Sequence, residues 1–263
     1  MQRFFVNPEE IQGQEVVFAP ARSRQIARVL RLKNGQNCMV LDNRGGELLV
    51  ELTQVEAGAC RAVIVERAEA QQERIDLLML LSLTQREKFE WMLQKCTEVG
   101  VSTFQPVITS RSLVQQPAQT IAKYERWKTI IWEAAEQSAR SRLPELLPPA
   151  GLAEAVAEAA RRCQRCLIPW EGEKARTLKG ALAGPAVGSV ALFIGPEGGF
   201  AEGEVQQAVN ASFNVVTLGR RILRMETAAV VSAALVLHEL ESTEADDGGT
   251  GSSGPIEIGR AHV

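Results

Sequence analysis

The spacing of hydrophobic residues changes near position 70 of the 263-residue chain. Before it, short apolar runs alternate with polar positions, as in strands with one buried face, and RAVIVER at 61–67 is the clearest case. Two further runs, 38–42 and 47–55, flank the residues Asn-Arg-Gly-Gly, which favour a hairpin turn. Short strands at this spacing predict a small β-barrel, interrupted by one helix at 23–32.

A second pattern begins after a polar segment at 69–73. Residues 75–83 form a nearly continuous apolar run, typical of a strand that is buried on both faces. Further strands are expected at 103–108, 165–170, 190–194 and 215–218, and helices at 85–99, 120–140, 152–162, 202–211 and 227–241. This alternation predicts an α/β fold with a largely parallel sheet. We therefore expect a barrel domain at 1–70, an α/β domain at 73–242 and a tail at 244–263.

The net charge of −3 for the full chain includes the charged residues of the tail, so it must be corrected before it is interpreted. The tail is rich in glycine and serine and has no hydrophobic period, so we expect it to be a remnant of expression cloning. The chain has 32 acidic and 29 basic residues, and leaving out four acids and one base from position 244 onward gives 28 of each. A neutral body neither supports nor excludes a nucleic-acid partner, which only local clusters of charge can indicate.

Several features argue against membrane insertion, secretion and metal chemistry. The longest apolar stretch, at 228–237, is much shorter than the roughly 20 residues that cross a bilayer. Acidic residues follow too early in MQRFFVNPEE for a secretory signal. The five cysteines lack a regular spacing and His238 is the single histidine before the tail, so we expect neither disulfides nor a metal site. These features predict a cytoplasmic protein.

The first candidate for chemistry is FIGPEGGF at 193–200, between a predicted strand and a predicted helix. Loops at the carboxyl ends of parallel strands bind ligands, and three glycines allow a close approach to the backbone. The segment is neither G-x-G-x-x-G nor a Walker loop, and Glu197 would repel a phosphate. A ligand held by backbone groups, or one that carries positive charge, fits better, although a purely structural turn is the alternative.

The second candidate is LGRRILRMETA at 218–228, which also joins a strand to a helix. Thr227 could cap that helix. Three arginines ahead of a helix start indicate an anion or an RNA backbone, and the alternative is a solvated basic loop. The helix that follows is apolar nearly all round, so it is either deeply buried or part of a subunit interface.

Taken together, GPEGGF and, about 20 residues later, LGRRILRMETAA resemble the signature of the RsmE-type methyltransferases. QREKFEWMLQKCTEVGV, IIWEAAEQSARS and RQIARVLRLKNGQ extend the resemblance over residues 1 to about 241. It implies S-adenosylmethionine-dependent methylation of N3 of a uridine in the decoding region of 16S ribosomal RNA, in the small ribosomal subunit. It also implies a C-terminal SPOUT domain with a trefoil knot in its parallel sheet, an N-terminal PUA-like β-barrel that binds RNA, and a homodimer that builds the site at its interface.

The resemblance places the cofactor between three loops. It assigns cofactor binding to Glu171, Ile194, Gly195, Glu197, Gly199, Leu218, Gly219, Ile222, Leu223, Arg224 and Thr227. Glycines beside a carboxylate suit a sulfonium without phosphate, and methyl transfer depends mainly on alignment. Uridine N3 must be unpaired and lose its proton, and an arginine near the uracil oxygens would stabilise the anion. For catalysis we select Arg224 and Arg140, with Glu197 as a weaker candidate for the proton acceptor.

RNA contacts are expected on the barrel, where five bases occur without an acid between positions 22 and 33. These are Arg22, Arg24, Arg28, Arg31 and Lys33. Arg24, Arg28 and Arg31 have the i, i+4, i+7 spacing of one helix face, and a merely solvated face is the alternative. Arg111 and Arg142 are further candidates. The family usually has glycine where Ala139 stands, and often a histidine near Ser23 or Arg24.

Two other functions remain open from the sequence. One is a SPOUT methyltransferase that acts on another RNA atom, such as a ribose hydroxyl. The other is a non-catalytic RNA-binding or ribosome-assembly factor without a methyl donor.

Overall fold

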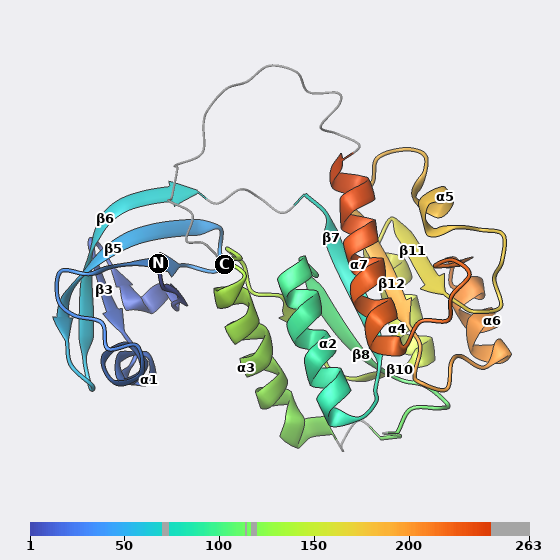
Figure 1. The fold of residues 1–263 in the computed structure, drawn as a ribbon, viewed down its shortest axis with the longest axis horizontal. Helices are drawn as coiled ribbons and strands as arrows, with labels where there is room; N and C mark the ends of the chain where they lie inside the picture. The colour runs from blue at the N-terminus through green and yellow to red at the C-terminus, as the bar shows by residue number, and fades with distance from the viewer. Residues whose placement is uncertain (70–73, 114, 117–119, 243–263) are drawn as a thin grey trace.

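A computed structural model describes residues 1–69, 74–113, 115–116 and 120–242, arranged around two β-sheets (Figure 1). The N-terminal sheet contains β1 (Arg3–Phe5), β2 (Ile11–Gln12), β3 (Glu15–Phe18), β4 (Asn37–Leu41), β5 (Gly46–Val55) and β6 (Cys60–Glu69), and a short 3-10 helix, η1 (Pro8–Glu10), precedes β2. Its strand order is β1-β4-β5-β6-β3-β2. The predicted hairpin is confirmed, since β4 and β5 pair antiparallel and the turn between them has positive φ at Asn43 and Gly45. The predicted tail lies outside the described residues.

The helix expected at 23–32 is different in the structure. Helix α1 (Pro20–Arg24) begins three residues earlier, because Pro20 suits the first helical position. It continues as a π-helical turn, η2 (Gln25–Val29), and the backbone then turns to φ +54° at Arg31. Arg31 is therefore outside the helix, and the prediction that it shares a helix face with Arg24 and Arg28 is wrong.

The second sheet confirms the predicted parallel α/β fold. Its strands are β7 (Asp76–Ser82), β8 (Thr103–Ile108), β9 (Glu145–Leu146), β10 (Ala150–Gly151), β11 (Arg165–Pro169), β12 (Ser189–Ile194) and β13 (Phe213–Val216). The order is β10-β8-β7-β12-β11-β13, β9 also pairs with β8, and every pair is parallel. The helices are α2 (Arg86–Val99), α3 (Ile121–Gln137), α4 (Leu152–Arg162), α5 (Leu178–Leu182), α6 (Glu202–Asn210) and α7 (Met225–Ser242). The trefoil knot stays a prediction.

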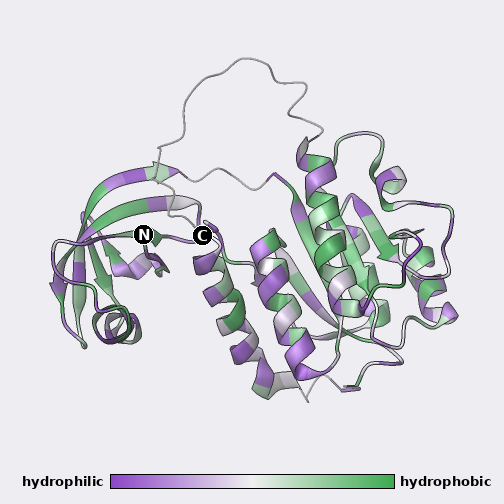
Figure 2. Ribbon diagram, viewed as in Figure 1, coloured by the Kyte–Doolittle hydropathy of each residue, from purple (hydrophilic) through white to green (hydrophobic). Residues whose placement is uncertain are grey.

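Strand β7 lies at the centre of this sheet and is buried on both faces, as predicted. Leu77, Met79 and Leu81 belong to the cluster that α2, α3 and α7 cover. Leu78 and Leu80 belong to the opposite cluster, which α4 and α6 cover. Figure 2 shows hydrophobic residues in the strands between these layers and along much of α7. Among the described helices, none is both long and apolar enough to cross a membrane.

Helix α3 joins the two domains. Glu136 accepts hydrogen bonds from Arg22 Nη2 at 2.6 Å and from the backbone N–H of Phe5 at 2.9 Å. The rings of Phe5 and Trp132 meet edge to face, with their centroids 5.7 Å apart. Since one carboxylate binds both β1 and α1, it attaches the N-terminal domain to α3 at two points.

Candidate active site

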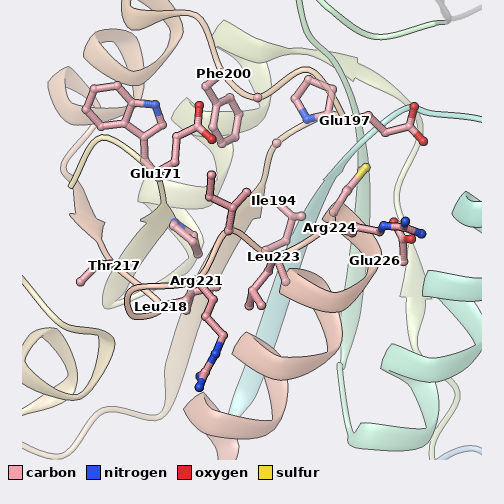
Figure 3. A pocket seen from close by; sticks show the side chains of 18 of the residues that line it. Glu171, Ile194, Glu197, Phe200, Thr217, Leu218, Arg221, Leu223, Arg224 and Glu226 are labelled. Atoms are coloured by element: carbon pink, nitrogen blue, oxygen red, sulfur yellow. The ribbon is translucent and has the colours of Figure 1, made fainter. Parts of the chain in front are cut away.

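A cavity of about 410 Å³ lies at the carboxyl ends of β11, β12 and β13, which are neighbours in the sheet (Figure 3). Its walls are the loops after these three strands and the start of α7. The volume is in the range of small-molecule sites, and the position is where parallel sheets bind their ligands. The two loops selected from the sequence therefore meet, with β11 and its loop between them.

The glycine-rich loop after β12 has little room for side chains on its backbone. A Cβ atom on Gly195 would lie 2.8 Å from the ring of Phe200, which is itself packed on Phe193. Gly199 has φ +68°, and its N–H donates to the carbonyl of Pro196 at 2.9 Å. The glycines at these two positions are thus required by packing and by backbone conformation.

Two cations from earlier in the chain contact this loop, and of the two only Lys88 also lines the cavity. Lys88, in the first turn of α2, forms an ion pair with Glu197. Arg111, which follows β8, donates from Nη1 to the carbonyl of Gly198. Arg111 was expected to contact RNA, and the structure places its guanidinium against the glycine-rich loop after β12.

The loop after β13 forms the opposite wall. Gly219 has φ +111°, and its N–H donates to Thr217 Oγ1 at 3.2 Å. Leu223 is half-buried and points into the cavity beside Ile194, whereas Ile222 is 85% exposed (Figure 3). Helix α7 begins two residues before the predicted start, so Thr227 lies within its first turn. The prediction that Thr227 caps the helix is therefore wrong, and its side chain is exposed outside the lining.

The loop after β11 closes the third side with Trp170, Glu171 and Lys174. Between Glu171 and Lys174, Glu173 accepts hydrogen bonds from the N–H groups of Ala175 and Arg176. These bonds lower the pKa of the Glu173 carboxyl. An ionised carboxylate thereby fixes the loop's turn.

The structure brings together ten of the eleven predicted cofactor residues, all except Thr227. They are Glu171, Ile194, Gly195, Glu197, Gly199, Leu218, Gly219, Ile222, Leu223 and Arg224. The lining residues that sequence reasoning missed include Lys88, Lys174 and Phe200. Lys88 could have been found, because it follows the carboxyl end of a buried strand, within the quoted segment QREKFEWM.

Arg140 was expected in the pocket, and the structure corrects this. Its side chain is buried away from the cavity lining and donates from Nη1 to the carbonyl of Thr97 at 3.1 Å, near the end of α2. Arg142 donates to the carbonyl of Arg44 in the barrel at 3.0 Å. Both arginines therefore contact backbone carbonyls within this chain.

The basic residues of the barrel separate into two kinds. Arg22 is paired with Glu136 at the domain contact. The remaining four are exposed, and these are Arg24, Arg28, Arg31 and Lys33. Only the exposed ones are placed to meet an RNA backbone.

The cavity lining fits S-adenosylmethionine. Its glutamates can face the sulfonium and the ammonium group, and Lys174, Arg220 and Arg221 can face the carboxylate. Apolar side chains such as Ile194, Leu218 and Leu223 offer a surface for the adenosine.

Metal and thiol chemistry have no comparable site in the described part of the chain. It contains no group of three or more histidine, cysteine, aspartate or glutamate residues that could hold a metal ion. Burial raises the pKa of the Cys163 thiol to about 12 and that of Cys166 to about 11, so both stay protonated at neutral pH.

Comparison with known proteins gives a consistent result. A family model described as an RNA methyltransferase domain matches residues 70–237, and an RNA methyltransferase PUA domain matches residues 24–65. Proteins named ribosomal RNA small subunit methyltransferase E are similar over most of the chain. The one from Synechocystis sp. is 34% identical over 91% of this chain and 78% of its own length. The one from Bacillus subtilis is 28% identical over 94% of this chain and 100% of its own.

Solved structures agree with these relatives. A crystal structure of a ribosomal RNA small subunit methyltransferase E from Neisseria gonorrhoeae, bound to S-adenosylmethionine, superposes with a TM-score of 0.82 at 32% identity. It covers 90% of this chain and 97% of that one. A putative methyltransferase from Legionella pneumophila, in complex with the same cofactor, has a TM-score of 0.80 at 29% identity over 90% of this chain and 96% of that one.

Proposed function

This chain belongs to the ribosomal RNA small subunit methyltransferase E family, and from this premise we propose that it methylates N3 of a uridine in 16S ribosomal RNA. It is an S-adenosylmethionine-dependent methyltransferase with a PUA domain. The observation that carries the proposal is the cavity that the loops after β11, β12 and β13 form together. Its lining combines apolar side chains with charged ones.

The residues of the chain act by holding the reactants in line. When bound, S-adenosylmethionine supplies a methyl group on a positively charged sulfur. Ile194, Leu218 and Leu223 hold the adenosine, and the glycine backbone at 195 and 199 allows it to approach closely. Alignment of the methyl carbon with the attacking nitrogen supplies most of the rate, because the leaving group is neutral.

The RNA reaches the enzyme through the barrel. Arg24, Arg28 and Lys33 are exposed on one segment of it and can bind phosphates without reading sequence. The target uridine must leave its base pair to enter the cavity, so the bound RNA presents an unpaired or flipped base. Ribosomal RNA as the substrate places the protein in the cytoplasm.

A second copy of the chain supports the site. Val231 and Leu235 are exposed on α7, and Trp91 is exposed on the adjoining α2. An apolar surface of this kind, on the helix whose first turn lines the cavity, suits a homodimer interface. Size measurement in solution should therefore give a dimer.

Mass spectrometry of 16S ribosomal RNA from a strain that lacks the gene tests the proposal. We expect 3-methyluridine to be lost and to return when the gene is restored. Retention of this nucleoside would contradict the proposal. Loss of a methyl group from another atom would instead support the alternative SPOUT reaction. Calorimetry of the purified protein should detect S-adenosylmethionine binding, which a non-catalytic assembly factor would lack.

A further inference from the structure

Charged side chains from separate parts of the chain meet at one end of the cavity. Glu197 is on the loop after β12, Arg224 and Glu226 are at the start of α7, and all three point to the same side (Figure 3). Lys88 comes from α2 and is ion-paired with Glu197. Leu218 and Leu223 occupy the apolar part of the cavity, so this charged end is left for the target base.

We propose that Lys88 is a catalytic residue, which donates with Arg224 to the two oxygens beside N3 of uracil, and that Glu197 positions its ammonium group. The inference rests on the proposed function and adds to it how the base is recognised.

The environment of Lys88 suits this role. Its side chain is 38% exposed and that of Glu197 is 34% exposed, so neither is sealed inside the protein. An ammonium group has three hydrogen-bond donors, and Glu197 occupies one of them. The others are available to a ligand that enters the cavity. Arg224, which is exposed at the same end, supplies a second set of donors.

The chemistry of uracil requires two donors of this kind. Loss of the N3 proton spreads negative charge over N3 and the flanking oxygens O2 and O4. Cations placed beforehand at those oxygens stabilise the anion without reorganisation. Cytosine has an amino group where uracil has O4, so a cation at this place would face another donor. The same pair therefore selects uracil over cytosine.

Glu197 is better suited to holding Lys88 than to taking the proton, which revises our initial candidate. The lone pair that attacks the methyl carbon lies along the line of the N3–H bond. A carboxylate fixed on this line by Lys88 would occupy the path of the methyl group. In the step we propose, the N3–H bond breaks and its proton passes to solvent water. The freed pair then bonds to the methyl carbon, while the C–S pair remains on sulfur.

Single-turnover methylation of small ribosomal subunits from the deletion strain tests the role of Lys88, from pH 6 to 10. Lys88→Met should react about 100-fold more slowly at pH 7, as expected for the loss of one donor to a developing anion. The deficit should shrink as pH rises, because alkali then removes the proton that Lys88 helps to release. Lys88→Arg should recover at least part of the rate.

Lys95→Met is the matched control, since Lys95 is on the same helix and pairs with Glu98 outside the cavity lining. It should behave as the wild type. S-adenosylmethionine binding by calorimetry should stay within about threefold in both variants, because the lost interaction is with the uracil anion rather than with the cofactor.

A second readout does not depend on turnover. S-adenosylhomocysteine has no methyl group to transfer, so the complex with it can be used to measure RNA binding alone. In this complex, the affinity of the wild type for the small subunits should increase as pH rises, because the N3 anion then forms. Lys88→Met should lose this increase. Equal rates for Lys88→Met and wild type at pH 7, or an unchanged pH profile, would overturn the inference.

Glu197→Gln separates the two roles of that carboxylate. If it positions Lys88, the loss should be smaller than that of Lys88→Met and should follow the same pH dependence. A larger loss than that of Lys88→Met, with a wild-type profile for the lysine variant, would make Glu197 the base and refute our assignment. If the wild type itself forms no 3-methyluridine, the proposed function fails, whatever Lys88 does.

Discussion

Two ion pairs in this molecule use the same kinds of groups for different purposes. Arg22 and Glu136 join the domains, with side chains 14% and 12% exposed. Lys88 and Glu197 meet at the cavity and are more than twice as exposed. Glu136 also accepts from Trp132 Nε1 at 2.8 Å, and Arg22 lies over the ring of Phe4. The Arg22–Glu136 pair is more buried and has more partners, which suits a structural role. The Lys88–Glu197 pair is more exposed, so its groups can also contact a substrate.

The largest effect should come from breaking the buried pair. Glu136→Ala leaves Arg22 without its carboxylate beside two aromatic rings, and we expect a loss of about 3 kcal/mol in the free energy of unfolding. Lys88→Met removes a more exposed pair and should cost less than about 1 kcal/mol. Urea unfolding of both variants measures the difference. Similar losses in the two would show that burial does not distinguish these pairs.

The cavity should be sensitive to packing rather than to global stability. Gly195→Ala places a methyl group 2.8 Å from Phe200, so the loop must shift. Overpacking of about 1–3 kcal/mol corresponds to a roughly 5- to 150-fold weaker affinity for S-adenosylmethionine, measured by calorimetry. Gly203→Ala on α6 is the control, because its new methyl group meets open space and affinity should be retained. Wild-type affinity in Gly195→Ala would mean that the cofactor binds elsewhere.

A smaller effect is expected where the barrel meets RNA. Arg28 is exposed, unlike Arg22 in the same basic segment. Arg28→Gln should weaken binding to ribosomal RNA and reduce the slope of log affinity against log salt by about 1, as for one lost phosphate contact. Arg161→Gln, on the surface of α4, should leave the slope unchanged. An unaltered slope in Arg28→Gln would remove this segment from the RNA-binding surface.

The smallest effect concerns Ala139, which follows the end of α3 with φ +60°. The N–H of Arg140 donates to the carbonyl of Ala135 at 3.0 Å, which makes this a Schellman-type helix end. Glycine prefers that conformation, so Ala139→Gly should stabilise the protein by about 0.5 kcal/mol, seen as a higher urea midpoint. A lower midpoint would mean that the flexibility of glycine in the unfolded chain outweighs the relief of strain.

Predictions from the sequence succeeded where the pattern of residues within one segment is enough to indicate its structure. The run at 75–83 predicted a strand with two buried faces, which the structure confirms, and the glycine-rich loop selected as a candidate site lines the cavity. It failed where distant residues decide the outcome. The burial of Arg140 depends on carbonyls of α2, and Lys88 is separated from Glu197 by 109 positions. The π-helical turn at Gln25–Val29 was also not predicted. The spacing of residues 23–32 indicated a regular α-helix, and the π-helical turn changes which residues share a helix face.

Helix α7 has a consequence for how the protein is made. Among the described elements it comes last along the chain, yet it packs on α2, β7 and β12 and supplies part of the cavity wall. A nascent chain therefore cannot bind cofactor until translation has passed this helix and the helix has docked on elements made much earlier.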